Sequence, residues 1–403
     1  MKKIISNKEE VKEVIEEFAR TTDEIVSLSE LKKLLLSGRQ LKIKFGVDVT
    51  APDLHIGHAV NLWMMRRLQD LGHKVIFLIG DFTTQIGDPT GKDKTRPVLP
   101  QKEIKENTKK FMEQVMMVLE DNPELTEIRK NSEWYDKMSA KELISLMSKV
   151  THNQLMAREM FQKRLEEGKS ICEHEVIYPV LQSYDSVILK DDLTIIGSDQ
   201  LFNEMMARSF QEKFDQQPQV VITTKITPGI DGEKKQSKSL DNYIGLNHSP
   251  RKKFGRIMSI PDKLITEYFK IYTKVSIEKI AEMSKNLEPM EYKLTLSEEI
   301  VKRYHGEKIA SRERAWFMKT FSKQEFPKNA PEIFLKVKKI TSFDIIRAYF
   351  PKDKSNSGIR RLFDQGAVTF NGKTVKDIKK EFVIPKEGLK VKVGKRNWFK
   401  AKP

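Results

Sequence analysis

Residues 41–80 read LKIKFGVDVTAPDLHIGHAVNLWMMRRLQDLGHKVIFLIG, and this stretch decides the fold. Leu41–Val47 alternates apolar and polar residues, which predicts a strand. Apolar residues at helical spacing from Ala59 to Leu71 predict a helix, and Gly72 ends it. A second strand is predicted over Val75–Gly80. The stretch is therefore a strand–helix–strand unit.

Two histidines, His55 and His58, lie where the first strand turns into the helix. The first amides of a helix have no internal partner and its dipole favours negative charge there, so an anion fits this position. Gly57 lets a flat ring or a phosphate approach the backbone, and imidazoles can donate hydrogen bonds to phosphate oxygens. Alternatively, the histidines cap the helix or lie on the surface. Zinc is less favoured, since a structural site needs four ligands and no cysteine pair is present.

Composition bounds the class of protein. The chain has 403 residues, which predicts two or three domains, and one cysteine, Cys172. A single cysteine excludes an intramolecular disulfide framework and fits a reducing cytoplasm. No apolar run approaches the roughly 20 residues that span a bilayer, and no signal segment is apparent, so we expect a cytoplasmic protein without a membrane partner.

Positive charge is concentrated at one end. The net charge is +16, and residues 341–403 carry 16 Lys and Arg against 6 Asp and Glu. A polyanionic partner fits this balance, and a compact basic module at one end predicts a nucleic-acid-binding arm on a less charged body.

Strands that alternate with helices in the first half predict a mostly parallel sheet with helices on both faces. Outside the opening unit, the pattern over Glu9–Gly38 predicts helix. The residues of Asn122–Asn131 are polar and turn-like. Ser186–Gly197 alternates as a strand does, and Val220–Thr224 predicts a short strand.

Two loops carry glycine, serine and cations in patterns typical of phosphate contacts. Gly87–Arg96 reads GDPTGKDKTR, in which Lys92 and Arg96 can reach phosphate oxygens, although the spacing of a Walker loop is absent. Residues 234–239 read KKQSKS, and two lysines three apart could close over a polyphosphate and stabilise charge in the transition state. Either stretch could instead be an ordinary loop with solvated charges.

A polar helix face and a strand-to-helix turn complete the candidates. Tyr178, Gln182 and Asp185 are spaced i, i+4, i+7, so phenol, amide and carboxylate share one face that could hold a small zwitterion with a polar ring substituent. The alternative is a helix start with a half-buried tyrosine. In residues 197–200, GSDQ, a glycine admits a ribose and Asp199 can accept from its hydroxyls, unless Ser198 or Asp199 only caps the helix.

Together and in this order, these motifs resemble one family. Residues 55–58, HIGH, and 235–239, KQSKS, are similar to the HIGH and KMSKS signatures of class I aminoacyl-tRNA synthetases. With the motifs between them, the whole chain resembles the bacterial tyrosyl-tRNA synthetases. Residues 357–368, SGIRRLFDQGAV, resemble the small RNA-binding domain, named after a ribosomal small-subunit protein, that ends these enzymes.

The resemblance implies roles for single residues. His55 and His58 would hold the ATP phosphates, with Thr50 beside them. The nucleotide site would also be lined by Gly46, Asp48, Gly57, Gly197 and Asp199. Mobile loops that close on the departing pyrophosphate would carry Lys92, Arg96, Lys235 and Lys238. RNA contacts would come from Arg360, Arg361 and Lys373.

The resemblance also implies a tyrosine pocket. Asp88, Tyr178 and Gln182 would bind the ammonium, Asp185 would meet the phenol hydroxyl, and Gln200 would lie by the reacting carboxylate. The best-known members have a tyrosine that shares the phenol hydroxyl two residues before the Gly46 position.

Here that residue is Lys44, as in a second bacterial subgroup that also reads Ala-Pro-Asp before its HIGH motif. Lys44 is therefore a further candidate for the tyrosine site. Gln236 replaces the usual Met of the lysine loop, at a position that varies in the family, and both lysines are kept.

The fold implied is α/β. A Rossmann-like parallel-sheet catalytic domain would cover residues 1–228, with a helical insertion at about 102–165. A lysine-loop and helical anticodon-side domain would follow over 229–325, then a linker over 326–340 and a small α+β RNA-binding domain over 341–403.

The activity implied is that of a tyrosine–tRNA ligase. It would activate L-tyrosine with ATP, which brings Mg²⁺, and then charge the 3′-terminal ribose of tRNA(Tyr), without zinc. A homodimer through the helices after Lys102 is expected. The alternatives are an inactive synthetase-like RNA-binding regulator and a nucleotidyltransferase that shares the HIGH-type site.

Overall fold

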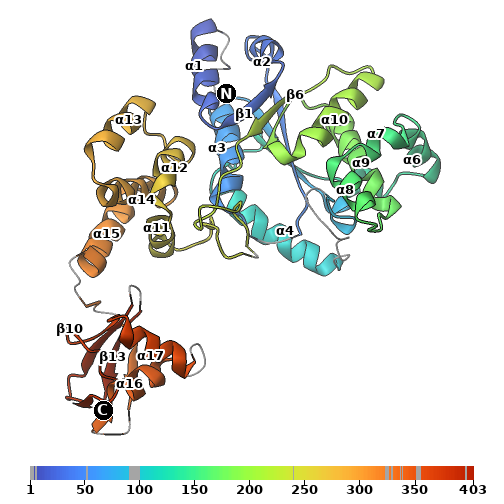
Figure 1. Ribbon diagram of the computed structural model, residues 1–403. Helices are drawn as coiled ribbons and strands as arrows, with labels where there is room; N and C mark the ends of the chain where they lie inside the picture. The colour runs from blue at the N-terminus through green and yellow to red at the C-terminus, as the bar shows by residue number, and fades with distance from the viewer. Residues whose placement is uncertain are drawn as a thin grey trace. The chain divides into compact units, whose positions relative to one another are not determined.

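The computed structural model describes residues 4, 7–50, 53–89, 100–238, 240–322, 326–327, 330–335, 337, 339–350, 355–394 and 397–403. The chain forms two compact units, Met1–Ala310 and Ser311–Pro403, and each is described by itself (Figure 1). The finer division into four segments stays a prediction. Among the described residues, no helix combines the length and the apolar character that crossing a bilayer requires.

The N-terminal unit is built on a six-stranded sheet of order β1-β6-β5-β2-β3-β4. Neighbouring strands from β6 to β4 run parallel, and β1 pairs antiparallel with β6 at one edge. The strands are β1 (Thr22–Val26), β2 (Lys42–Val47), β3 (Lys74–Ile79), β4 (Thr126–Lys130), β5 (Leu193–Gly197) and β6 (Val220–Thr224). The predicted α/β class with a mostly parallel sheet is confirmed.

Both faces of this sheet are buried. Along β3, Val75, Phe77 and Ile79 join the main hydrophobic cluster, whereas the intervening Ile76 and Leu78 pack with Leu189 on the other face. This alternation follows from the two-residue period of a strand. The main cluster receives α1 (Lys8–Ala19), α2 (Leu28–Leu35), α3 (Ile56–Asp70) and α4 (Gln101–Val115).

The second face carries α9 (Glu173–Leu189) and α10 (Leu201–Lys213), which pack closely together. Smaller helices pack against these two through a separate cluster centred on Phe161 and Phe210. They are α6 (Ala140–Met147), α7 (His152–Met156) and α8 (Glu159–Glu166), preceded by the short α5 (Ser132–Tyr135).

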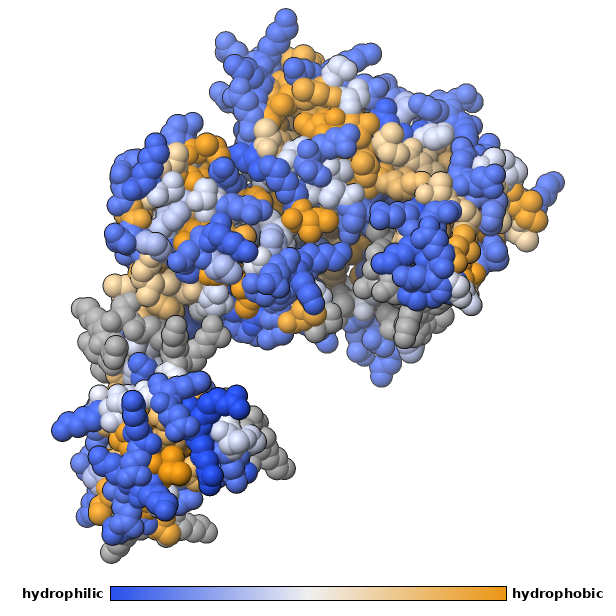
Figure 2. Space-filling view, in the orientation of Figure 1, coloured by the Kyte–Doolittle hydropathy of each residue, from blue (hydrophilic) through white to orange (hydrophobic). Residues whose placement is uncertain are grey.

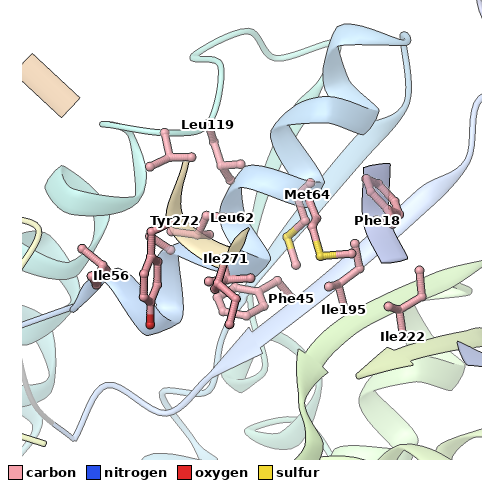
Figure 3. Packing of buried hydrophobic residues seen from close by; sticks show 14 of the residues in the cluster. Phe18, Phe45, Ile56, Leu62, Met64, Leu119, Ile195, Ile222, Ile271 and Tyr272 are labelled. Atoms are coloured by element: carbon pink, nitrogen blue, oxygen red, sulfur yellow. The ribbon is translucent and has the colours of Figure 1, made fainter. Parts of the chain in front are cut away.

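The helices after the lysine loop share the main core rather than forming their own. Ile271 and Tyr272 of α12 lie beside Ile56 and Leu62 of α3 (Figure 3). The helices that join this core are α11 (Pro250–Met258), α12 (Ile265–Tyr272), α13 (Ile277–Asn286) and α14 (Pro289–His305), and α15 (Glu307–Phe317) follows them. This shared core fixes the lysine loop relative to the sheet.

Three local predictions were wrong. Strand β1 interrupts the helix predicted over Glu9–Gly38, and β4 lies inside the stretch read as turns. Each of these strands has its one partner in another part of the chain, so local periodicity carries little signal for it. The strand predicted over Ser186–Gly197 begins only at Leu193, because the apolar last turn of α9 is buried and reads like a strand.

After the end of α15, the C-terminal unit contains a five-stranded sheet of order β10-β9-β12-β13-β7, a β11–β8 pair and the helices α16 and α17. Its elements are β7 (Glu332–Phe334), β8 (Lys339–Thr341), α16 (Ser342–Tyr349), α17 (Asn356–Asp364), β9 (Val368–Phe370), β10 (Lys373–Thr374), β11 (Glu381–Val383), β12 (Leu389–Val393) and β13 (Asn397–Lys402). The stretch predicted as a linker, 326–340, thus supplies β7 and β8, whose partners β13 and β11 follow much later in the chain.

Candidate active site

The HIGH-like motif begins α3 and is fastened to the segment after the lysine loop. His55 is the extended residue before the helix, which starts at Ile56, three residues earlier than predicted. The Ile56 N–H donates to the Ile244 carbonyl at 2.9 Å, and the Leu246 N–H donates to the Leu54 carbonyl at 2.9 Å. These backbone bonds hold together two motifs that lie far apart in the sequence.

The two imidazoles stack, with ring centroids 3.8 Å apart. His58 Nδ1 accepts from the His55 N–H at 3.3 Å, so its proton resides on Nε2, where it can be donated to a ligand. Loss of hydration, and then repulsion from Lys235, lowers the pKa of His58 to about 4, although part of the residue faces solvent. A Cβ on Gly57 would lie 2.9 Å from His55 Nδ1, so glycine is needed there.

Both lysines of the lysine loop reach carboxylates of other motifs. Lys235 Nζ lies 3.6 Å from Asp199 Oδ2, in the turn after β5. Lys238 Nζ lies 2.6 Å from Asp53 Oδ2, two residues before the HIGH-like motif, and this hydrogen bond raises the pKa of Lys238. The HIGH-like motif, the lysine loop and residues 197–200 therefore surround one site.

Gln236 is the anchor of the lysine loop. Its buried amide donates to the Tyr272 hydroxyl at 2.9 Å and accepts from the Ile244 N–H at 3.2 Å. Its Nε2 also approaches the Cβ position of Gly57 to 3.7 Å. The amide that replaces the usual Met thus ties the loop to α12 and to Ile244, whose carbonyl accepts from the first residue of α3.

Asp48, at the carboxyl end of β2, organises the neighbouring loop. Its carboxylate accepts from Thr83 Oγ1 at 2.8 Å, the Tyr178 hydroxyl at 3.0 Å and the Asp88 N–H at 3.2 Å. Burial, opposed by these hydrogen bonds, raises the pKa of Asp48 to about 6. A Cβ on Gly80 would lie 2.5 Å from Asp48 Oδ1, so the carboxylate requires glycine there.

A chain of side-chain amides joins residues that are predicted to bind the substrate tyrosine. Asp88 accepts from Gln200 Nε2 at 2.6 Å, and Asn203 Nδ2 donates to both Gln200 Oε1 at 3.0 Å and Gln182 Oε1 at 2.8 Å. Gln182 Nε2 then donates to Glu204 Oε1 at 2.9 Å. A carboxylate at each end therefore fixes the orientation of the amides between them.

Lys44 lies inside the protein rather than on an open pocket wall. Its Nζ donates to Glu204 Oε2 at 2.8 Å and to Ser186 Oγ at 2.5 Å, and the residue is 1% exposed. Burial alone would lower the pKa of Lys44, but the carboxylates of Glu204, Asp191 and Asp185 together outweigh it and the net pKa is raised. Lys44 is thus connected, through Glu204 and Gln182, to the residues that are predicted to bind the substrate tyrosine.

Asp185 lies buried on α9. Its Oδ1 accepts from Trp134 Nε1 at 3.0 Å and its Oδ2 accepts from Asn131 Nδ2 at 3.5 Å. Burial, opposed by Lys44 and by hydrogen bonds, raises the pKa of Asp185 to about 7. Asn131 also donates to Thr83 at 2.9 Å, so this carboxylate is linked to that of Asp48.

The structure brings most predicted site residues together and adds others. Thr50, Gly46 and Gly197 lie on the turns and strand ends around this site, and a Cβ on Gly197 would lie 2.8 Å from Asp199 Oδ1. Lys92 and Arg96 lie outside the described residues.

Sequence reasoning missed Asp53, Gly80, Thr83, Asn131, Trp134, Asn203 and Glu204, and it undervalued Gln236. Helical spacing from Gln200 could have indicated Asn203 and Glu204, and the position next to the HIGH-like motif could have indicated Asp53.

The three residues predicted to bind RNA are all exposed. Arg360 and Arg361 lie on α17, and Lys373 lies on β10. Hydrophilic side chains cover most of the face of this unit that Figure 2 shows. Within the described residues, no three His, Cys, Asp or Glu side chains gather in a way that could hold a metal ion.

Comparison with known proteins agrees with this geometry. Residues 36–322 match the family of class I tRNA synthetases (W and Y). The tyrosine–tRNA ligase of Aquifex aeolicus is 44% identical over 94% of this chain and 96% of its own length. The chain belongs to the class I tyrosyl-tRNA synthetase family. A second family member, the tyrosine–tRNA ligase of Carboxydothermus hydrogenoformans, is 42% identical over 97% of this chain and 98% of its own.

Solved structures of the family share the fold. A C-terminally truncated mitochondrial tyrosyl-tRNA synthetase of Aspergillus nidulans aligns with a TM-score of 0.64 at 21% identity, over 78% of this chain and 97% of that one. The tyrosyl-tRNA synthetase of Archaeoglobus fulgidus, complexed with L-tyrosine, aligns with a TM-score of 0.59 at 20% identity, over 75% and 99%. Nothing in these comparisons supports the inactive regulator.

Proposed function

We propose that this chain joins L-tyrosine to tRNA(Tyr) in two steps at the site built by the HIGH-like motif, the lysine loop and the amide chain. One observation carries this proposal: the Ile56 N–H donates to the Ile244 carbonyl and the Leu54 carbonyl accepts from the Leu246 N–H, which holds the stacked imidazoles beside the segment that follows the lysine loop. This places neutral and cationic donors around one space at the carboxyl end of a parallel sheet, where such folds bind nucleotides.

In the first step a tyrosine carboxylate oxygen attacks the α-phosphorus of ATP. A new P–O bond forms, the bond between that phosphorus and the α–β bridging oxygen breaks, and pyrophosphate leaves with the magnesium ion that ATP brought. His58 Nε2 and the His55 ring, both kept neutral by lowered pKa values, donate to phosphate oxygens. Lys235 and Lys238, together with Lys92 and Arg96, stabilise the charge that develops on pyrophosphate, while Thr50, Gly46, Gly57, Gly197 and Asp199 line the nucleotide.

The amino acid lies on the amide chain. Asp88, Tyr178 and Gln182 bind its ammonium, Gln200 lies by its carboxylate, and Asp185 accepts from its phenol hydroxyl. Phenylalanine is rejected because it would leave the buried Asp185 without that donor. Tyrosyl-tRNA synthetases are the standard case in which a buried polar group rejects a substrate that lacks the matching hydroxyl.

In the second step a terminal ribose hydroxyl of the tRNA attacks the tyrosyl carbonyl and AMP leaves. Arg360, Arg361 and Lys373 contact tRNA phosphates, which makes affinity salt-dependent. The enzyme acts as a homodimer. The large side chains Met117 and Ile128, 42% and 47% exposed, support a partner surface beyond α4 and along the edge strand β4.

Tyrosine-dependent exchange of labelled pyrophosphate into ATP tests the proposal. We expect exchange with L-tyrosine and none with L-phenylalanine or L-tryptophan. Arg360→Gln/Arg361→Gln should keep this exchange and lose most tRNA charging, because it touches only the second step. Exchange that ignores tyrosine contradicts the activity, and equal loss of exchange and charging in the variant contradicts the role of the basic unit.

A further inference from the structure

A cavity of about 260 Å³ lies in the N-terminal unit, and none of its lining residues belongs to the site described above. It is bounded by the end of α1, by α3, by the end of α12 and by Arg303 of α14. Phe18, Val60 and Met64 give it an apolar wall, and the side chains of Phe18 and Met64 lie close together in Figure 3.

Four cations line this cavity: Arg20, Lys270, Lys274 and Arg303. The carboxylate that also lines it, Glu17, is bound by Arg67, with Oε2 2.8 Å from Nε. Within the described part of the chain, no carboxylate lies at ion-pair distance from any of the four cations. Their charge is therefore not neutralised by direct contacts.

The two arginines are held in place, but each has a hydrogen-bond donor without a partner. Arg303 Nη1 donates to the Tyr272 carbonyl at 2.9 Å, and its guanidinium lies 4.2 Å from the centre of the Trp63 ring. Arg20 Nη2 donates to the Thr273 carbonyl at 3.4 Å. The Nε atom of each is buried and has no partner. Burial lowers the pKa of both side chains, and their mutual repulsion adds to this in Arg303.

We propose that this cavity binds an anion of the phosphate class. Guanidinium and ammonium groups are the donors that phosphate oxygens prefer, and the cavity has room for a phosphate group. Glu17 acts on Arg20 and Arg303, and Glu278 acts on Arg20, only through space, so an anion in direct contact would offset the positive charge that remains. The phosphate can belong to a nucleic-acid backbone or be free in solution, and the experiment separates these sources.

The test compares three full-length proteins. Lys270→Gln/Lys274→Gln removes two exposed cations from the cavity rim and leaves the packed arginines in place, so folding is not at risk. Lys141→Gln/Lys163→Gln removes the same charge from α6 and α8, which contribute nothing to the cavity. Wild type completes the set. Affinity for a tyrosine-accepting tRNA transcript is measured across salt concentrations, and the thermal midpoint is measured with and without inorganic phosphate.

For a backbone phosphate, the rim variant should bind the transcript about tenfold more weakly than the control at low salt, with a salt slope smaller by about one. For a free phosphate, transcript binding stays unchanged, but phosphate raises the midpoint of wild type and control more than that of the rim variant. Rim and control variants that behave alike in both measurements overturn the proposal. Arg303→Met, where it folds, should deepen whichever effect is seen.

Discussion

The two ends of the active site hold their charges in opposite ways. At the amino-acid end, Lys44 and Glu204 pair at 2.8 Å with side chains only 2% exposed. At the phosphate end, Lys238 pairs with Asp53 at 2.6 Å while its side chain is 54% exposed, and the Lys235–Asp199 pair is more open still. Similar distances therefore occur in very different surroundings.

This difference in burial makes the Lys44–Glu204 pair rigid and lets the pairs of Lys235 and Lys238 open. A buried pair cannot open without leaving a charge in the interior, whereas an exposed pair opens into water at little cost. The part of the site where we propose that the amino acid binds is thus held in one arrangement, which suits the choice of a substrate. In the proposed reaction, Lys235 and Lys238 would leave their carboxylates and follow the charge that develops on the phosphates.

The largest effect is expected from Lys44→Met, which breaks the buried pair. The variant leaves Glu204 uncompensated, so the free energy of unfolding should fall by about 3–5 kcal/mol in urea titrations. Lys42→Met on the same strand, where the lysine is exposed, should change it by less than about 0.5 kcal/mol. Adding Glu204→Gln to Lys44→Met should recover part of the loss. Equal stability of the two lysine variants would remove the contrast between the two ends.

A more gradual effect concerns pH and Asp185. Its folded-state pKa of about 7 lies above the ordinary 3.8, so the folded protein holds this proton more tightly than the unfolded chain. The contribution of this carboxyl to the free energy of unfolding should therefore fall as pH rises from about 4 to about 7, by roughly 1.4 kcal/mol for each unit at most, and level off above. Asp191, whose pKa burial also raises to about 7, and Asp48, with a pKa of about 6, act in the same direction. Histidines such as His58 and His73, whose pKa values are lowered to about 4, act in the opposite one.

Asp185→Asn should remove this part of the slope of stability against pH, so the stability of wild type relative to the variant should decline between pH 5 and pH 7, while Asp191 keeps its own share. Asp136→Asn, at an exposed position beyond α5, should keep the slope. Unfolding free energies in urea at each pH give the comparison. A slope that survives Asp185→Asn unchanged would show that this carboxylate ionises as readily as an exposed one.

The smallest effect is expected at the open end. Asp53→Asn removes the partner of Lys238, so the lysine no longer has to leave a carboxylate when ATP enters. We expect the KM for ATP in the exchange assay to fall by about threefold, with the KM for tyrosine unchanged, in keeping with the small worth of exposed ion pairs. Asp70→Asn removes an exposed carboxylate from α3 and should alter neither value. A KM for ATP that rises tenfold would mean that Asp53 positions Lys238 for catalysis.

Residue types and spacing predicted much of this site. Tyr178, Gln182 and Asp185 lie on one helix, and the i, i+4, i+7 spacing alone indicated their shared face. The parallel strand–helix–strand unit could also be predicted from one continuous stretch of sequence. By contrast, β1 and β4 were not predicted. Each of them pairs with a strand from another part of the chain, so its own sequence carries little sign of it.

By itself, the sequence determined which groups are available and which of them share a short element: paired imidazoles at a helix start, two lysines in one loop and a polar helix face. Only the tertiary structure decided their partners. Lys44 meets Glu204 across 160 positions, and Gln236 meets Tyr272 across 36. The physical reason is that periodicity describes an element, whereas the partner of a buried charge depends on how whole elements pack around one core.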